Sequence, residues 1–406
     1  MMFKFGSVTV TLLAALCLAA IPAGARTSAQ TNVQKAQPTA ADYLSDAQAL
    51  PGLIAANYAY LDHLPGGVMP DSPILDAERD AVHDHDSLLR YAEDTITTLA
   101  DHHGLTQDSF KDDWAIVPSY SDLWIVRSDG AYVIDAVKPG SPAEKAGLRR
   151  GDRLSAVDGM NMDTMIRVFW ARLGLEITDE RAAYAARVLA AGRRDRDRYL
   201  TVVGATGVPR NVTLASLYAD QTSLPPVTVI SGPKGVTRIK LNNDLGDNAT
   251  ITAFDAAMAQ IPPRAPVVID LTDTPSGGNT SVARAIMGWF VTKPMPYQVH
   301  NLPSEMRETG IARQWIEEVL PRAGKYHPGP VSVRAGRWTG SLGEGLAIGF
   351  KALGKPVCGT SMAGLKGAVY DFDLPKTGLR VKFPAERLYT VAGAPRETVV
   401  LPACRD

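Results

Sequence analysis

The chain has 406 residues, so roughly two to three domains are expected. A hydrophobic content of 45% and a charged content of 21% are typical of a globular protein with a full core. The formal net charge of −1 gives no electrostatic basis for binding nucleic acid or an anionic membrane surface. Both classes are therefore excluded as principal partners.

The N-terminal segment 1–25 has the pattern of an export signal. Lys4 supplies a positive charge, residues 8–21 are apolar, and an Ala-Gly-Ala sequence at 23–25 provides a cleavage site. The apolar run is too short to be a convincing membrane span. We therefore expect a mature chain that begins near Arg26, is exported to the periplasm or secreted, and keeps no membrane span.

Three segments of different character precede the C-terminal half. Residues 26–40 are polar and predict a flexible leader. Apolar residues recur at helical spacing through 41–115, with a break at Pro65-Gly66-Gly67, and predict a small helical module. Residues 116–224 read mainly as strands with a helical insert, and their mixed-sign charge run at 193–198 predicts a solvated turn.

The order of elements within 116–224 is specific. A strand over 131–137 leads to Ser141-Pro142-Ala143-Glu144, a capping box with proline at the first helical position, and a second strand ends at Asp158-Gly159. This passage resembles the core of a PDZ domain, which binds a peptide C-terminus as an additional strand. The resemblance places the peptide-binding segment at Leu123-Trp124-Ile125.

Residues 225–406 alternate strand and helix patterns and predict an α/β domain. Ser341 stands between a strand-like run and an apolar helical run. Its hydroxyl and the N–H of Leu342 are expected near the positive end of a helix, where a nucleophile and half of an oxyanion hole are useful. The alternative is a plain N-cap, because Ser341 and Glu344 also form a capping box.

Two further features accompany Ser341. Lys366 lies 25 positions later between glycine-rich residues, and a lysine can act as general base only if burial lowers its pKa. Taken alone it is more often a solvated surface residue. Upstream, a buried strand runs into Pro275-Ser276-Gly277-Gly278, a turn that can expose backbone N–H groups to an oxyanion or simply supply positive φ.

Together these residues resemble the tail-specific, or C-terminal processing, serine peptidases. The resemblance covers roughly residues 41–402 and implies a ClpP/crotonase-like core. Tyr370 stands where the family has a glutamine. The positions that match the family motifs are Asp270-Leu271, Pro275, Gly277-Gly278, Ser341, Glu344 and Lys366-Gly367.

The resemblance implies a Ser–Lys dyad that hydrolyses unfolded or C-terminally presented polypeptides. Ser341 Oγ would attack the scissile carbonyl, and neutral Lys366 would take its proton. The N–H groups of Leu342 and of Gly277 or Gly278 would bind the oxyanion, and no cofactor or metal is needed. The alternative is a catalytically inactive relative that serves as a peptide- or hydrophobic-ligand-binding scaffold.

Other reactive residues leave narrower possibilities. Cys358 and Cys404 either pair, which would pin the C-terminus to the strand before Lys366, or remain free thiols. Ser361 lies in a near nucleophile-elbow sequence but lacks the helix that must follow it. Four histidines beside aspartates match no tetrahedral or His-Glu-x-x-His metal pattern; these are His83, His85, His102 and His103.

Overall fold

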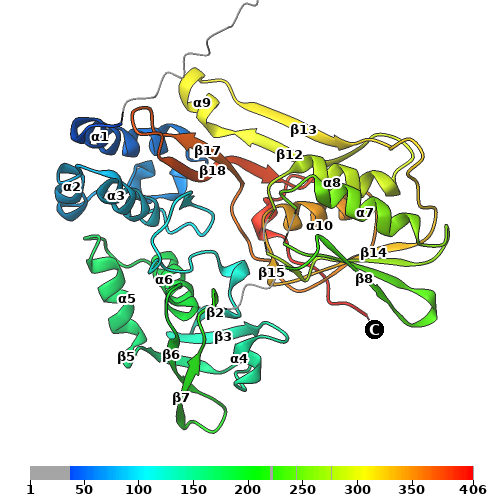
Figure 1. Cartoon of the computed structure of the whole chain (residues 1–406), viewed down its shortest axis with the longest axis horizontal. Coiled ribbons are helices and arrows are strands. Elements are labelled where there is room, and N and C mark those ends of the chain that lie inside the picture. Colours follow the sequence, from blue (N-terminus) through cyan, green and yellow to red (C-terminus); the bar gives the residue numbers. More distant parts are fainter. Residues whose placement is uncertain (1–36, 220–222, 244, 276, 406) are drawn as a thin grey trace, which may run out of the picture. The chain divides into compact units, whose positions relative to one another are not determined.

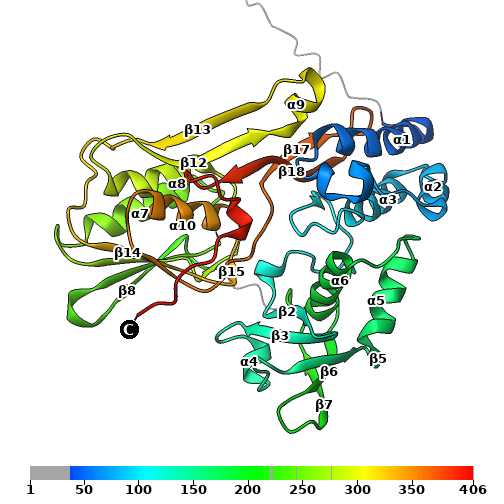
Figure 2. The ribbon, with the colours of Figure 1, turned by 180° about the vertical axis from the view of Figure 1, so that it is seen from behind.

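The computed structural model (Figures 1 and 2) describes residues 37–219, 223–243, 245–275 and 277–405. The expected signal segment 1–25, all but the last four residues of the expected leader, and Ser276 lie outside these residues. From Pro38 onward the chain forms one compact unit. Within the described residues, no helix combines the length and the apolar character needed to cross a membrane.

Three helices confirm the helical pattern of the first module: α1 (Ala40–Asn57), α2 (Pro73–Asp80) and α3 (His85–Thr97). Each begins after a polar residue whose side chain accepts a hydrogen bond from a first-turn N–H, which satisfies one of the unpaired donors there. The N-cap residues are Thr39, Ser72 and Asp84. The predicted break is a short 3₁₀ helix, Pro65–Gly67, between α1 and α2.

This module shares its core with the C-terminal half of the chain. Strand β1 (Leu105–Thr106) pairs antiparallel with β18 (Arg380–Tyr389). Val381 and Phe383 of β18 are fully buried among residues of α1 and α3, and the Phe383 ring lies 6.5 Å from that of Tyr58. The helices and this distant strand therefore fold as one core.

Among the described residues, the C-terminal domain forms one five-stranded sheet by itself and a second one that is completed by β1 of the helical module. In the first, four strands are parallel and β8 is antiparallel at the edge; the order is β16 (Val357–Gly359), β14 (Val331–Ala335), β10 (Val267–Asp270), β9 (Thr237–Leu241) and β8 (Val227–Ser231). The second is antiparallel; its order is β1, β18, β12 (Met295–Leu302) and β13 (Arg313–Val319), with β17 (Ala368–Asp373) also paired to β18.

Helices α7 (Ala249–Ala259), α8 (Thr280–Met287) and α10 (Leu342–Ala352) lie between these two sheets (Figures 1 and 2). The short helix α9 (Pro303–Thr309) connects β12 to β13. The predicted α/β domain is thus confirmed as a layered arrangement with a mainly parallel sheet.

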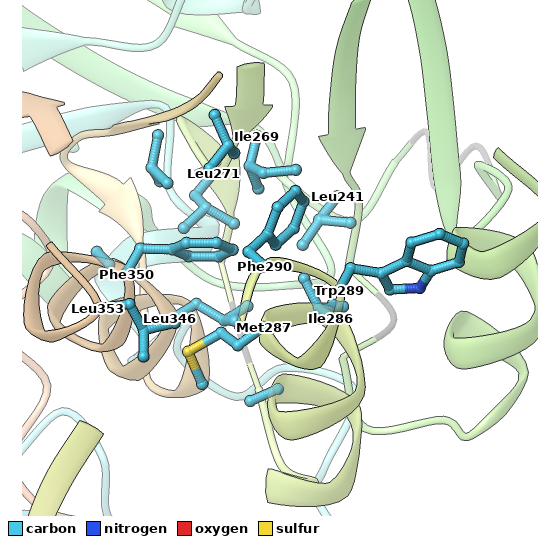
Figure 3. Packing of buried hydrophobic residues seen from close by; sticks show 14 of the residues in the cluster. Leu241, Ile269, Leu271, Ile286, Met287, Trp289, Phe290, Leu346, Phe350 and Leu353 are labelled. Atoms are coloured by element: carbon cyan, nitrogen blue, oxygen red, sulfur yellow. The ribbon is translucent and has the colours of Figure 1, made fainter. Parts of the chain in front are cut away.

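Apolar side chains from α8 and α10 meet the parallel sheet in one buried cluster (Figure 3). Ile269 of β10, Ile286 of α8, and Leu346 and Phe350 of α10 have no exposed surface. Leu346 and Phe350 are four positions apart and so lie on the same face of α10. The N-terminal end of α10, where Ser341 stands, is therefore fixed by the packing of the whole helix.

The PDZ-like domain is built around a sheet in the order β2 (Leu123–Ser128), β3 (Ala131–Val137), β4 (Arg153–Val157), β6 (Arg198–Val203) and β7 (Pro209–Leu214), with β5 (Met160–Asn161) paired to β4. Its helices are α4 (Pro142–Lys145), α5 (Met162–Ala171) and α6 (Asp179–Ala191). Ser141 caps α4 and Pro142 is its first residue, as the sequence predicts.

The charge run at 193–198 is not a solvated turn throughout. The Arg198 side chain is only 1% exposed and donates to both carboxylate oxygens of Asp122, at 2.7 and 2.9 Å. Residues 195–197 are exposed. The prediction missed this buried ion pair because its two members lie 76 positions apart in the sequence.

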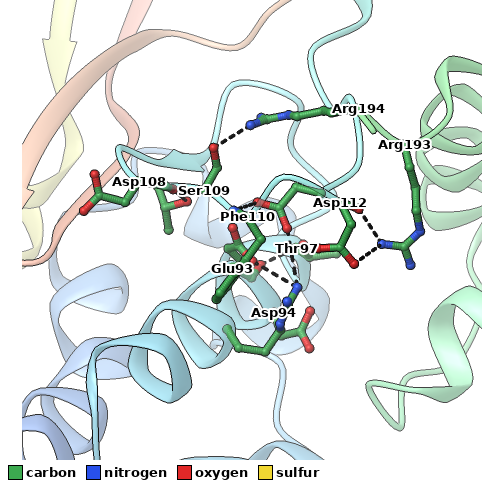
Figure 4. Close-up of polar contacts among 12 residues, drawn as sticks. Glu93, Asp94, Thr97, Asp108, Ser109, Phe110, Asp112, Arg193 and Arg194 are labelled. Carbon is green, nitrogen blue, oxygen red and sulfur yellow. Dashed lines mark hydrogen bonds and ion pairs between the residues drawn. The ribbon is translucent and has the colours of Figure 1, made fainter. Parts of the chain in front are cut away.

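The same run attaches the PDZ-like domain to the last part of the helical module, after α3 (Figure 4). Arg193 donates to the carbonyl oxygen of Asp112 at 2.7 Å, and Arg194 donates to Ser109 Oγ at 2.6 Å. Both arginines are half-buried. These contacts connect the PDZ-like domain to the chain segment just after His103.

The C-terminal segment is attached to the parallel sheet by a covalent bond. Cys358 of β16 and Cys404 form a disulfide, which resolves the alternative that the sequence left open. The N–H of Gly359 also donates to the carbonyl oxygen of Pro402 at 2.8 Å, and Leu401 is buried in the core of the domain. The last residues of the described chain are therefore part of the folded domain.

Candidate active site

Two loops meet at the carboxyl ends of the central strands. Beyond β10 and β14, the short strands β11 (Asp273–Thr274) and β15 (Trp338–Thr339) pair in parallel. The N–H of Gly340 donates to the carbonyl oxygen of Thr274 at 2.9 Å. Parallel pairing makes the two segments leave the sheet side by side, so the Ser341 turn and the glycine turn at 277–278 are neighbours.

Ser341 has an unusual backbone conformation. It is the N-cap of α10, with φ 49° and ψ −115°, a positive φ that costs an L-residue free energy. Its N–H donates to Glu344 Oε2 at 2.9 Å. Its Oγ lies 3.1 Å from Nε2 of His103, which is a distance for hydrogen bonding. The strained turn therefore directs the hydroxyl toward an imidazole.

The orientation of His103 is set by its second nitrogen. Nδ1 lies 2.7 Å from the carbonyl oxygen of Lys366. Since a carbonyl oxygen only accepts, Nδ1 must carry the proton, and Nε2 is left as the acceptor for the Ser341 hydroxyl. The backbone N–H of His103 also donates to Asp101 Oδ1 at 2.9 Å. Burial lowers the pKa of His103 to about 4, so the imidazole is neutral at neutral pH.

The side chain of Lys366 lies elsewhere. Its Nζ is 5.5 Å from the centroid of the Tyr60 ring, a cation–π geometry, while its main-chain carbonyl reaches Ser341 through His103. The structure thus brings Ser341 together with His103, and the role of Lys366 as general base stays a prediction.

Sequence reasoning weighed His103 only as a metal ligand. His103 and Ser341 lie 238 positions apart in the sequence. No spacing rule links a histidine that follows one helix to a serine that precedes another helix. His102, its neighbour, points to the carbonyl oxygen of Ile116 instead, at 2.6 Å. Among the described residues, no group of three or more metal-ligating side chains converges.

Glu344 joins the turn of Ser341 to the loop before Lys366. Its carboxylate is fully buried and accepts from the N–H groups of Ser341 at 2.9 Å, Gly364 at 2.8 Å and Leu365 at 3.2 Å. Burial raises the pKa of Glu344 to about 7, against the opposing effects of the Arg396 charge and of these donors. The Glu344 side chain therefore fixes the turn of Ser341 relative to the loop before Lys366.

The predicted oxyanion-hole residues are in direct contact. A Cβ atom on Gly277 would lie 2.0 Å from Leu342 Cβ and 2.3 Å from Leu342 N, so only glycine fits at this position. Gly278 has φ 143°, which side-chain-bearing residues rarely adopt. Ser119 Oγ donates to the carbonyl oxygen of Pro275 at 2.6 Å and helps to fix the turn.

A cavity of about 660 Å³ lies beside Ser341, and β12, β13, β17 and β18 contribute to its walls. Among its lining residues, His300 contacts Glu386 through Nδ1 at 2.7 Å and Glu317 through Nε2 at 3.1 Å. Burial alone would lower the pKa of His300, but the two carboxylates raise it to about 9. Tyr370, at the family's glutamine position, donates to Glu386.

The segment predicted to bind peptide is buried. Leu123 and Ile125 are 1% and 0% exposed in the core of the PDZ-like domain. Trp124 is 3% exposed and packs against Ala363 and Leu365, in the loop that leads to Lys366. Trp124 is buried because the PDZ-like domain packs against the C-terminal domain at this point. A local sequence pattern does not show such packing between domains. Trp124 therefore contacts the loop of the candidate active site, and peptide binding by this segment stays a prediction.

Comparison with known proteins identifies the fold. The PDZ domain family matches residues 133–169. The structure of mature CPAF complexed with lactacystin has a TM-score of 0.52 and 13% sequence identity, covering 90% of this chain and 93% of that one. The photosystem II D1 C-terminal processing protease has a TM-score of 0.53 and 16% identity, covering 89% and 92%. This chain has the fold of a C-terminal processing protease.

The resemblance seen in the motifs is thereby confirmed at the level of the fold, with its PDZ domain. No curated protein matches the chain in sequence.

The depressed pKa of His103 predicts how stability depends on pH. Its folded value of about 4 lies below the ordinary 6.5, so the unfolded state binds more protons between these values. The stability contributed by the neutral imidazole is present above pH 6.5 and is lost as the pH falls toward 4. We expect the wild type to lose about 3 kcal/mol more than His103→Gln over this interval.

Urea unfolding of both proteins at pH 7 and pH 4 measures this difference. The matched control is His83→Gln, because the His83 side chain is 70% exposed and should leave the loss as in the wild type. An equal loss in wild type and His103→Gln would show that His103 is not buried as a neutral group.

Proposed function

We propose that this chain is a serine peptidase in which Ser341 is the nucleophile and His103 its general base. The observation that carries the proposal is the 3.1 Å contact between Ser341 Oγ and His103 Nε2, with Nδ1 held by the Lys366 carbonyl. A nucleophile in contact with a base that a third group orients is the arrangement required for nucleophilic catalysis. The substrates that we propose are unfolded or C-terminally presented polypeptides.

In the proposed reaction, His103 takes the Ser341 proton as Oγ attacks the scissile carbonyl carbon. The resulting oxyanion accepts hydrogen bonds from the N–H of Leu342 and from Gly277 or Gly278. The protonated imidazole then gives its proton to the leaving amine, and an acyl-enzyme remains. His103 next deprotonates a water that attacks the ester, and the proton returns to Ser341 Oγ.

The Ser341–Lys366 dyad is the second candidate for the same reaction. The spacing of the two residues and the glycines around Lys366 favour it. For Lys366 to act as base, its Nζ would have to leave the Tyr60 ring and reach the Ser341 hydroxyl. The two candidates make opposite predictions for substitutions at His103 and Lys366.

We expect Ser341→Ala to abolish labelling by a fluorophosphonate and cleavage of an unfolded model protein. His103→Gln should slow both by about a hundredfold or more, the usual worth of a general base. Lys366→Met keeps the carbonyl that orients His103 and should cost less than about tenfold. Labelling rates and gel-based cleavage assays at pH 7.5 measure these effects on folded proteins.

The reverse ranking, with Lys366→Met inactive and His103→Gln active, would assign the base to Lys366. A wild type that neither labels nor cleaves would instead favour the catalytically inactive scaffold.

The glycine turn allows a second test. Gly277→Ala places a methyl group 2.0 Å from Leu342 Cβ and must push the turn away from the N-terminal end of α10. Removal of an oxyanion donor costs about 10² to 10³ in kcat, and we expect a loss of this size. Gly52→Ala in α1 is the control, because no atom lies within 4 Å of its new Cβ. Unchanged kcat in Gly277→Ala would argue against the assigned oxyanion hole.

We further propose that the protein is exported to the periplasm or secreted. The support is the signal pattern over 1–25, together with the disulfide between Cys358 and Cys404, which is typical of oxidising compartments. We expect protein recovered from the periplasm or medium of a bacterial host to begin at or near Arg26 on N-terminal sequencing. Retention in the cytoplasm with Met1 or Met2 at the N-terminus would contradict export.

A further inference from the structure

A buried arginine holds the loop that orients the candidate base. Arg396 is 2% exposed and lies in the short 3₁₀ helix Arg396–Thr398 near the C-terminus. Its Nη2 donates to the carbonyl oxygens of Leu365 at 2.8 Å and Gly367 at 2.7 Å. Both bonds are buried, so water does not compete for the two carbonyl groups.

The carbonyl group of Lys366, between those of Leu365 and Gly367 in the chain, accepts from a different donor. Three consecutive residues present their carbonyl oxygens to buried donors, and the middle one, Lys366, accepts from His103 Nδ1 at 2.7 Å. The turn is tight at Gly367, which has φ 50° and whose Cβ would lie 2.0 Å from the carbonyl oxygen of Glu386. With the peptide groups on both sides fixed, the Lys366 carbonyl has little freedom to rotate away from His103.

The cost of burying Arg396 indicates that it is not there for stability alone. Among the described residues, it forms no salt bridge within 4.0 Å, and its Nε has no hydrogen-bond partner. The fully buried Glu344 carboxylate is its electrostatic partner, since Arg396 lowers the pKa of Glu344, but the two side chains form no direct ion pair. Burial of a charge that is not directly paired is unfavourable, and an apolar side chain of similar size would often be more stable. Its hydrogen bonds are made to the one loop on which the tautomer of His103 depends.

We propose that Arg396 is a positioning residue that fixes the tautomer of His103 through the Lys366 carbonyl. Arg396 lines the cavity beside Ser341, and among the described residues no hydrogen bond joins it to Ser341 or His103. It orients the acceptor of the Nδ1 proton, and so leaves Nε2 free to receive the proton of Ser341. This inference deepens the proposed function and rests on it for its consequence in catalysis.

The segment that carries Arg396 is itself anchored. Eight residues later Cys404 is joined to Cys358 of β16, and Leu401 lies in the core of the catalytic domain. A positioning group must be held by rigid elements to be effective, and the parallel sheet supplies the rigidity here. The C-terminal segment thus connects the sheet to the loop of Lys366.

The test compares Arg396→Met with Arg396→Lys, which keeps a charge and N–H donors, and with Arg387→Met as the matched control. Arg387 also donates to a buried main-chain carbonyl, that of Ala59, but not in the loop of Lys366. The first readout is the pair of ¹⁵N chemical shifts of the His103 ring. The second is the pH dependence of Ser341 labelling by a fluorophosphonate.

We expect Arg396→Met to lose the single-tautomer ¹⁵N pattern of His103 and to label at least about tenfold more slowly at pH 7, since a wrong tautomer is severely damaging. Loss of the nearby guanidinium, which lowers the His103 pKa, should also move the midpoint of the pH profile upward. Arg396→Lys should restore part of the rate, and Arg387→Met should match the wild type in both readouts.

A purely structural role would lower the melting temperature of Arg396→Met but leave the ¹⁵N pattern and pH midpoint of the folded protein unchanged, and this result would overturn the proposal. If Arg396→Met does not fold, Cys404→Ser releases the same segment and should shift the ¹⁵N pattern in the same direction; an unchanged pattern there also counts against it. A wild type that never labels refutes the peptidase function, whereas the ¹⁵N readout, which needs no substrate, still decides the role of Arg396.

Discussion

The hydrogen bond between His103 Nδ1 and the carbonyl oxygen of Lys366 is the contact on which the site depends. It is 2.7 Å long and joins residues 263 positions apart. Because the carbonyl can only accept, this bond decides which imidazole nitrogen faces Ser341. Burial keeps the ring neutral, and the bond makes that neutral ring a proton acceptor at Nε2. Without a fixed tautomer, Nε2 could carry the proton, and its 3.1 Å contact with Ser341 Oγ could then not accept the hydroxyl proton.

The loop that supplies this carbonyl is held by two buried charges of opposite sign. Glu344 accepts from the N–H groups of Gly364 and Leu365, and Arg396 donates to the carbonyl oxygens of Leu365 and Gly367. A buried charge is tolerable only when it is hydrogen-bonded, and here main-chain groups provide those bonds. The glycines let the loop adopt the shape, but the two charged side chains determine which shape it keeps.

Sequence reasoning located the parts of the site that are specified by local patterns. Ser341 at a strand–helix junction and Gly277 in a turn after a buried strand are both features of a few adjacent residues, and the parallel sheet then places them together. His103 could not be found in this way, because its function depends on a contact across domains. The burial of Trp124 was missed for the same reason: a strand pattern shows that one face is apolar but not which domain covers it.

The surroundings of Lys366 differ from the pattern of the peptidases that the chain resembles. Tyr370 occupies the place of the glutamine that would orient the lysine, and its hydroxyl donates to Glu386 instead. The Lys366 Nζ lies 5.5 Å from the centroid of the Tyr60 ring, in a cation–π geometry. A general base must be neutral and in contact with its nucleophile, and His103 meets both conditions. In the proposed mechanism the main-chain carbonyl of Lys366 orients His103, while its Nζ lies over the Tyr60 ring.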